Sequence, residues 1–510
     1  MRVSKPEDIE SSKRSPSFLS HTATYAISGI ARRLVGFVML PIYTRYLTPA
    51  DYGVIGLLAF SMAVFEPIFG ARLGRAIPKF YLETNDAHTR RAVIWGALGL
   101  TGAVSAITMF GIMGFRRSGA ELLFGNQVYA LALGLFAVNL LSQPIEGTGM
   151  AYIRLQGRSR LVLVLSLAKL ALQLSLNLLL VVCWRGGVKG VIESGIISSS
   201  LTAVVVTVYV AMNERPAFDW QLTRRMLRFV WPLWLSGIAG LYIGSSGAMY
   251  LRVFDSLSDV GRLELGLKLA ATVGFLLWAP FSQHWEPMSF RYYHAVNGER
   301  KFQVAFTALA AVMIAGGLGV SIFAEPLIRV MAAGPFQAAA GIVPMLVLGF
   351  VFNRLSAFFN FSFVVTGHTK VTALCQYATA VVITVAYLVL VPRFGLVGAA
   401  YAQLIGYATG FGIMRVISRR YYDPGYRFVP FMTFLSIATI AYVASTLASW
   451  QQGAVVDLGA KSLAWVAAAT LITWIAVRSI ASLDVEALAD LPRPVAWVTR
   501  IAGVRAATRV

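Results

Sequence analysis

The sequence has 510 residues, of which 57% are hydrophobic and only 13% are charged, whereas soluble domains carry about 25% charged residues. This composition, with a mean hydropathy of +0.68, excludes a soluble globular domain and indicates a membrane protein. The net charge of +21 is dispersed along the chain and forms no basic stripe with interleaved aromatic residues, which argues against a nucleic-acid partner.

The chain begins with a polar arm, residues 1–17, which we expect to be cytoplasmic. No small-residue cleavage site follows a short apolar core there, so we expect the first span itself to direct insertion. The sequence contains two cysteines, Cys183 and Cys375, and both lie in apolar runs. Neither a disulfide framework nor a cysteine metal site is therefore expected.

Apolar runs of about 20 residues, long enough to cross a bilayer as a helix, recur along the chain. Six fill its first part, at 18–41, 53–75, 92–114, 122–145, 161–183 and 188–211. Six more follow, at 229–251, 263–287, 302–324, 338–365, 371–391 and 395–418, and two last runs lie at 429–449 and 460–480. The sequence thus predicts an all-α polytopic membrane protein with about 14 transmembrane helices.

Short segments recur in the same order about 210 residues apart. The echoed pairs are Tyr46 to Gly53 with Phe254 to Gly261, Gln156 to Arg160 with Thr366 to Lys370, and Gly187 to Gly190 with Gly395 to Gly398. Two long repeats in a membrane chain predict two lobes. We expect the lobes at 18–215 and 216–420, two additional helices at 421–482, and a cytoplasmic tail at 483–510.

Lysine and arginine concentrate in the even-numbered loops of this topology, whereas the odd-numbered loops carry few. Short basic loops favour the cytoplasmic side of a membrane. We therefore expect both termini in the cytoplasm and the protein in the inner, cytoplasmic membrane.

The segment from Leu40 to Gly53 reads Leu-Pro-Ile-Tyr-Thr-Arg-Tyr-Leu-Thr-Pro-Ala-Asp-Tyr-Gly. It resembles the N-terminal signature of the polysaccharide transporters, the Wzx-type flippases of the multidrug/oligosaccharidyl-lipid/polysaccharide exporter superfamily. Arg154 to Ser159, the basic amphipathic segment before Pro232 and the expected helix count extend the resemblance over most of the chain. It implies two six-helix lobes around a V-shaped central cavity and movement of a polyprenyl-diphosphate-linked glycan from the inner to the outer leaflet.

An anionic diphosphate cannot cross hydrocarbon without cations at membrane depth. Arg32 or Arg33 in the first span is the first candidate, and the sequence does not decide which faces the cavity. The other candidate substrate-binding residues are Arg72, Arg75, Arg252, Lys268 and Arg354. Each of these candidate cations has a structural explanation as an alternative to substrate binding. Its side chain can extend to the membrane interface, form an ion pair, or belong to an ordinary basic cytoplasmic flank.

Coupled transport would need a group that binds a proton or Na⁺, and no other cofactor is expected. Glu66, which precedes Pro67, and Glu264, one turn before Lys268, are the candidates. Pairing with a nearby cation is the competing explanation for each. His284 and Glu286 are candidate gate residues at the end of a span, although an interfacial histidine is the plainer interpretation.

Three other functions fit parts of the pattern. A drug antiporter of the same superfamily would share the fold, but the intramembrane arginines favour an anionic substrate. A flippase for the peptidoglycan lipid precursor would share the cations. A membrane glycosyltransferase or polymerase would need a catalytic cluster, and none is recognised. The expected partners are the lipid-linked glycan, membrane lipids and the polysaccharide polymerase machinery.

Overall fold

The computed structural model describes residues 39–69, 73–332, 334–448 and 454–482, and these residues form helices without any strand. Ten helical segments within this part are long and apolar enough to cross a membrane. The all-helical, multi-pass architecture is therefore confirmed, but the count of fourteen is not. Most of the expected first span lies outside the described residues, and the ten segments do not include α3 (Pro49–Phe69) or α10 (Trp220–Ser245).

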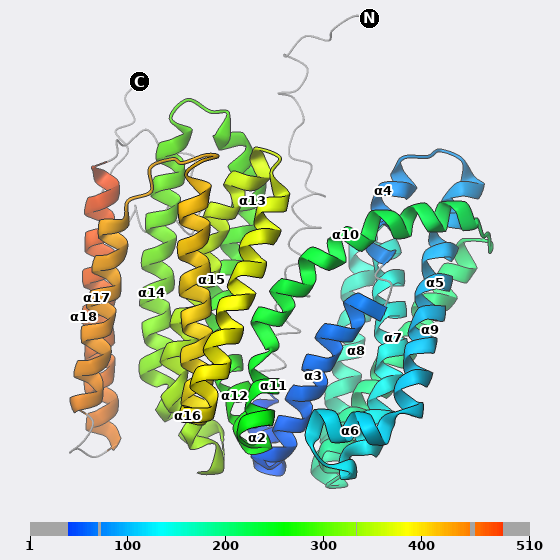
Figure 1. The fold of residues 1–510 in the computed structure, drawn as a ribbon, viewed down its shortest axis with the longest axis horizontal. Coiled ribbons are helices and arrows are strands. Elements are labelled where there is room, and N and C mark those ends of the chain that lie inside the picture. Colours follow the sequence, from blue (N-terminus) through cyan, green and yellow to red (C-terminus); the bar gives the residue numbers. More distant parts are fainter. Residues whose placement is uncertain (1–38, 70–72, 333, 449–453, 483–510) are drawn as a thin grey trace, which may run out of the picture. The chain divides into compact units, whose positions relative to one another are not determined.

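Contacts divide the chain into two compact units. Unit 1 consists of Met1–Leu47 and Leu58–Ile238, and unit 2 consists of Thr48–Leu57 and Ala239–Val510. The division falls inside two helices, α3 and α10, whereas the repeat suggested a boundary at residue 215. The lobe boundaries drawn from the sequence stay a prediction, and Figure 1 follows the chain through both units.

Unit 1 contains a helical bundle in which α7 packs between α5 and α9, and α8 packs on α9. Its helices before α7 are α2 (Leu40–Tyr46), the later part of α3 (Pro49–Phe69), α4 (Ile77–Leu82), α5 (Ala87–Gly114) and α6 (Arg116–Phe124). The later ones are α7 (Ala130–Leu155), α8 (Ser159–Asn177) with a π-helical end at Leu178–Cys183, α9 (Gly187–Asn213) and the first part of α10 (Trp220–Ser245).

The start of α10 differs most from the sequence-based expectation, which placed a span at 229–251. The helix begins at Trp220, and the backbone N–H of Leu222 donates to Asp219 Oδ1 over 3.0 Å. Leu222, Met226 and Val230 are buried in the core of unit 1, while Arg224 and its basic neighbours are exposed. These first turns are amphipathic, so a search for continuous apolar runs does not detect them.

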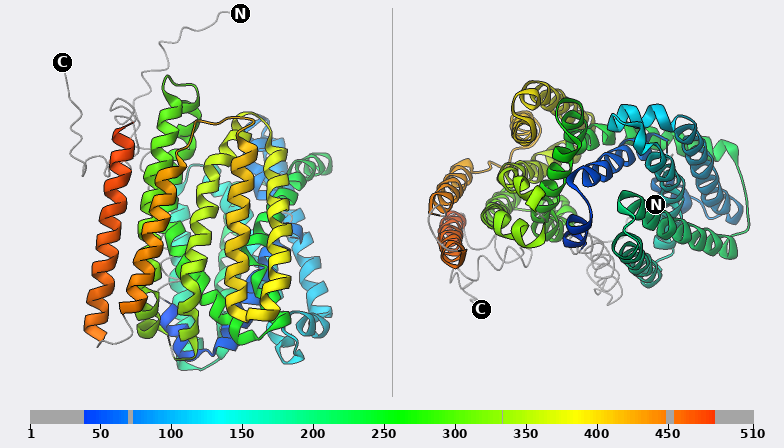
Figure 2. Two further views of the ribbon diagram at one scale, coloured as in Figure 1. Left: turned by 60° about the vertical axis from the view of Figure 1, so that its left-hand side comes forward. Right: turned by 90° about the horizontal axis from the view of Figure 1, so that it is seen from below.

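Unit 2 is built around α14. Its elements before α14 are α11 (Gly247–Phe254), α12 (Leu257–Val273), a π-helical segment η5 (Gly274–Trp278) and α13 (Ala279–Tyr293). The later ones are α14 (Gly298–Met331), a 3₁₀ segment η6 (Gly334–Ile342), α15 (Val343–Val365), α16 (Thr369–Ser418), α17 (Phe428–Ala448) and α18 (Ala454–Ala481). The last two helices lie side by side against α14 (Figures 1 and 2).

Glycines let neighbouring helices approach α14 closely. A β carbon at Gly317 would lie 2.8 Å from the Val347 side chain, and one at Gly319 would lie 2.8 Å from Trp465 Nε1. The indole N–H of Trp465 donates to the carbonyl of Ala315 over 2.9 Å. The absence of side chains at Gly317 and Gly319 of α14 therefore allows α15 and α18 to pack closely against it.

The internal repeat predicted from the sequence is confirmed at the turns. Gly157 and Gly367 both adopt left-handed backbone conformations, with φ of 72° and 77°, directly after α7 and α15. Gly187 and Gly395 are also left-handed, with φ of 53° and 51°. Gly395 breaks α16 into two helices, which agrees with the separate runs expected at 371–391 and 395–418.

Because a side chain strains the left-handed conformation, Gly157→Ala and Gly367→Ala are each expected to destabilise the protein by about 1 kcal/mol. No atom lies within 4 Å of a β carbon at either position, so the cost comes from the backbone alone. Thermal unfolding of the purified variants measures this effect. The control is Gly147→Ala within α7, where there is also open space and φ is not positive; an equal loss there would contradict the explanation.

Candidate functional site

Two helices, one from each repeat, begin with the same local structure. At the start of α3, Thr48 Oγ1 donates to Asp51 Oδ2 over 2.7 Å, and the Asp51 backbone N–H donates to Thr48 Oγ1 over 3.1 Å. At the start of α12, Ser256 Oγ donates to Asp259 Oδ2 over 2.8 Å, and the Asp259 N–H returns to Ser256 Oγ over 3.1 Å. Each pair caps the N-terminus of its helix by accepting hydrogen bonds from backbone N–H groups that have no partner within the helix. The capping residue therefore defines where each helix begins.

These two helix starts cross at a pair of equivalent glycines. A β carbon at Gly53 would collide with the backbone oxygen of Leu257, and one at Gly261 would collide with the backbone oxygen of Pro49. The repeat equates Gly53 with Gly261 and Pro49 with Leu257, so the contact is reciprocal. Only glycine permits this approach of one backbone to the other. All four residues belong to unit 2.

Next to the crossing, the structure places Lys268 against Tyr52. Lys268 Nζ donates to the Tyr52 hydroxyl over 2.5 Å and lies 4.6 Å from the centre of its ring. Tyr52 is only 1% exposed and meets Phe336 edge to face. Glu264 lies one turn before Lys268, and a β carbon at Gly56 would collide with its side chain. Gly56 thus leaves the space that the Glu264 carboxylate occupies.

The chemistry of this cluster suits an anionic ligand. An ammonium group has three N–H donors, and one of those on Lys268 is directed to Tyr52. Within the described part of the chain, Lys268 makes no further hydrogen bond, and Glu264 accepts none. Two donors of Lys268 therefore remain after the described residues are counted, while Glu264 lies nearby without a direct contact that would occupy them. The assignment of Lys268 to substrate binding and of Glu264 to ion coupling stays a prediction.

The other cations predicted for the second lobe lie on separate helices. Arg252 is near the end of α11, and its buried Nε has no hydrogen-bond partner within the described residues. Arg354 lies on α15, where its Nε would be 3.6 Å from a β carbon at Gly274, the start of the π-helical segment η5. Both are partly buried, and their assignment to substrate binding stays a prediction.

The two gate candidates, His284 and Glu286, are exposed on α13. Trp285 between them is buried and packs on Phe281 and Phe358. The burial of Trp285 sets the rotation of α13 about its axis. The side chains of its neighbours, His284 and Glu286, therefore face away from the core. Their role as a gate stays a prediction.

Five of the site residues predicted from the sequence lie outside the described residues or have side chains that the structure does not describe. Arg32, Arg33 and Arg72 lie outside the described residues. Glu66 lies on α3 and Arg75 ends the 3₁₀ turn Leu73–Arg75, but neither side chain is described. Their proposed roles in substrate binding and ion coupling therefore stay predictions.

Sequence reasoning missed the partner of Lys268. Tyr52 belongs to the segment that resembles the family signature. Its place in that segment is the only sequence signal that could have indicated a functional role for it. Two other intramembrane pairs also became visible only in the fold: Lys169 Nζ lies 2.5 Å from Glu146 Oε2, and Lys461 Nζ lies 2.8 Å from Asp457 Oδ2. Among the described residues, no group of three or more His, Cys, Asp or Glu side chains could hold a metal ion.

Several solved structures with the same fold are titled as flippases or multidrug transporters. The structure titled "Lipid II flippase MurJ, inward closed conformation" matches with a TM-score of 0.74 and 12% identity, covering 90% of this chain and 99% of that one. An inward-facing multidrug resistance MATE family transporter of the MOP superfamily matches with a TM-score of 0.54 and 16% identity, over 76% of this chain and 94% of that one. The MATE multidrug transporter DinF-BH matches with a TM-score of 0.56 and 16% identity, over 83% of this chain and 99% of that one.

At these identities the likeness establishes the fold alone. No curated protein sequence matches the chain. The model of the polysaccharide biosynthesis protein family matches residues 18–293, more than half of the sequence and all of the α3 and α12 crossing. The chain therefore belongs to the polysaccharide biosynthesis protein family.

Proposed function

We propose that the protein is a flippase that moves polyprenyl-diphosphate-linked oligosaccharide units from the cytoplasmic to the outer leaflet of the inner membrane. The product would serve the synthesis of a surface polysaccharide such as O-antigen, exopolysaccharide or capsule. The observation that carries the proposal is Lys268, an intramembrane cation that keeps two N–H donors after its bonds to the described residues are counted, on a helix that the family model covers. In this proposal the protein is a transporter and catalyses no covalent reaction.

Lys268 would hold a diphosphate oxygen during translocation, and the prenyl chain would remain in lipid. Arg32 or Arg33 from the first repeat, with Arg75, would supply the remaining positive charge. Such pairing lowers the free-energy cost of taking a diphosphate out of water. The protein cations replace the water molecules that bound the phosphate oxygens, so the negative charge always has hydrogen-bond donors.

Alternating access requires a contact that forms in one state and separates in another. The reciprocal glycine crossing of α3 and α12 is suited to this role, because it joins equivalent helices of the two repeats by close approach of their backbones. Glu264, beside the crossing, would bind the coupling H⁺ or Na⁺.

A second candidate function is transport of the peptidoglycan precursor, which the TM-score of 0.74 to the lipid II flippase favours. Both functions use a prenyl diphosphate, so the Lys268 site fits each. The glycan attached to the diphosphate distinguishes them.

The experiment compares the leaflet distribution of prenyl-diphosphate-linked glycans in cells with and without the protein. A membrane-impermeant glycan-binding probe reports the outer leaflet, and mass spectrometry identifies the glycan. Loss of the protein is expected to trap an intact oligosaccharide-linked lipid on the cytoplasmic leaflet. Trapping of the peptidoglycan precursor instead would favour the second candidate, and an unchanged distribution of both lipids would overturn the proposal.

A further inference from the structure

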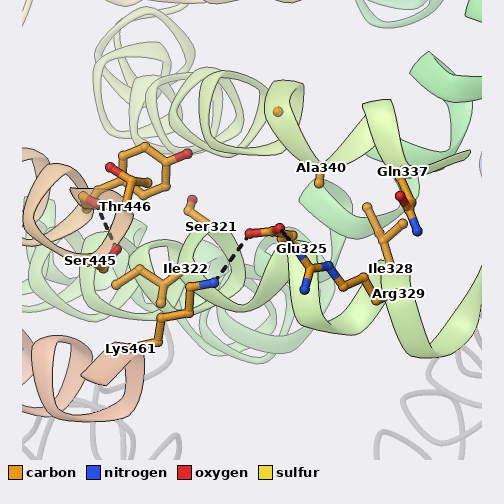
Figure 3. A pocket seen from close by; sticks show the side chains of 12 residues that line it. Ser321, Ile322, Glu325, Ile328, Arg329, Gln337, Ala340, Ser445, Thr446 and Lys461 are labelled. Atoms are coloured by element: carbon orange, nitrogen blue, oxygen red, sulfur yellow. Dashed lines mark hydrogen bonds and ion pairs between the residues drawn. The ribbon is translucent and has the colours of Figure 1, made fainter. Parts of the chain in front are cut away.

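A polar cavity of about 310 Å³ lies within unit 2, where α14 ends, α17 ends and α18 begins. It contains charged groups that the transport site does not use (Figure 3). The loop charges described above predict that this end of the helices lies on the outer side of the membrane. Its lining includes Ser321, Glu325, Arg329, Ser445 and Lys461.

The charges in the cavity alternate in sign. The side chain of Lys461 is 4% exposed, and its Nζ lies 2.8 Å from Asp457 Oδ2 and 3.3 Å from Glu325 Oε2. Glu325 also pairs with Arg329, whose side chain is 60% exposed. A guanidinium has five N–H donors, so Arg329 keeps donors for a further anion after pairing with Glu325. The cavity thus offers a cation, Arg329, directly beside a carboxylate, Glu325, as Figure 3 shows; the side chain of Glu325 is 46% exposed.

The hydroxyl groups of the cavity present oxygen acceptors. Ser321 Oγ donates to the Gly317 carbonyl over 2.8 Å, and Ser445 Oγ donates to the Tyr442 carbonyl over 2.7 Å. A hydroxyl has one proton and two lone pairs, so each retains acceptor capacity after making this bond. Together with Glu325, these oxygens suit a ligand that carries N–H donors.

An apolar cavity of about 230 Å³ continues from the polar one and shares Ser321, Gly341 and Tyr442 with it. Its other walls are mainly aliphatic residues of α14, α15 and α17. The two cavities together extend along α17 from Thr446 to Leu435, about 16 Å at 1.5 Å per residue. This length, which includes the polar cavity, is of the order of one leaflet, whose hydrocarbon half is about 15 Å thick.

We propose that the two cavities form one binding site for a phospholipid with a phosphoethanolamine head group. Arg329 binds the phosphate, Glu325 and the serine hydroxyls bind the primary ammonium, and one acyl chain occupies the apolar cavity. A free phosphate would not use the apolar extension, and a lipid whose head group lacks an ammonium group would offer no N–H donor to the free acceptor positions of Glu325 and the two serines. The bound lipid would join α17 and α18 to α14. This inference does not depend on the proposed function.

Native mass spectrometry of the full-length protein in detergent, with phosphatidylethanolamine added, measures the binding. The wild type is expected to retain one lipid per chain, and phosphatidylglycerol is expected to compete poorly. Loss of a charged hydrogen bond in Arg329→Ala should weaken binding about tenfold. Arg393→Ala is the matched control, an exposed arginine of α16 that does not line either cavity.

A second variant tests the apolar half. Ala438 lines the apolar cavity, so Ala438→Phe should exclude the acyl chain and abolish retention while the head-group residues stay intact. Thermal unfolding of each variant shows whether it is folded, and Arg329→Lys, which keeps the charge, should retain part of the affinity. Equal retention by wild type and Arg329→Ala, or equal binding of phosphatidylglycerol, would overturn the proposal.

Discussion

Replacement of Lys268 by glutamine is expected to reduce translocation of the lipid-linked glycan about 10- to 150-fold. The substitution removes a charge-assisted hydrogen bond to phosphate, which is worth about 1.5–3 kcal/mol, and each 1.4 kcal/mol changes a rate or affinity tenfold. Lys268→Arg keeps the charge and should retain part of the activity. The measurement is the rate at which the glycan becomes accessible to the outer-leaflet probe, normalised to the amount of inserted protein.

The same substitution also affects folding, because it leaves the Glu264 carboxylate without its nearby cation. A buried carboxylate without a nearby cation is costly, so Lys268→Gln is also expected to lower the temperature of thermal unfolding. The double variant Lys268→Gln, Glu264→Gln removes both charges and should recover thermal stability without recovering transport. Wild-type transport by this double variant would show that Lys268 has a structural role only.

A methyl group at the helix crossing is expected to lower the stability of the protein strongly. Gly53→Ala and Gly261→Ala would each place a β carbon against a backbone oxygen of the facing helix, at Leu257 or Pro49. Backbone atoms cannot move aside as a flexible side chain can, so each variant should lose about 2–3 kcal/mol. Because the contact is reciprocal, the two losses should be similar. Thermal unfolding in detergent gives both values.

The control for the crossing is Gly99→Ala in α5, where no atom lies within 4 Å of the added carbon. A helical glycine in open space should be neutral or stabilised by about 0.5–1 kcal/mol on this change. Hydrogen exchange should also rise in residues 48–57 of the crossing variants and stay unchanged in the control. Crossing variants as stable as the control would contradict the close approach of α3 and α12.

Much of the fold could be predicted from local signals. Apolar runs located most spans, since the requirement for a long apolar helix is met within a single segment. The repeated turn glycines were visible because Gly157, Gly187, Gly367 and Gly395 adopt conformations that other residues disfavour. The start of α10 was misplaced because its first turns bury only one face, so hydropathy averaged over the window falls there.

The candidate site was predicted only in part. Lys268 and Glu264 stand out in the sequence because charged residues are rare in apolar runs. Their neighbours could not be found in this way. Tyr52, the hydrogen-bond partner of Lys268, lies 216 residues earlier in the chain, and nothing in the residues around Lys268 identifies it.

The sequence by itself therefore determined the membrane-spanning helices, the internal repeat and the family resemblance, because hydropathy, backbone preference and signature residues are properties of short segments. Only the tertiary structure decided that Gly53 and Gly261 cross, that Gly56 makes room for Glu264, and that Lys461 meets Glu325 from another helix. These contacts depend on which faces of the helices pack together. In a nearly uniformly apolar chain, hydropathy does not mark those faces, and close packing and buried charge pairs select them.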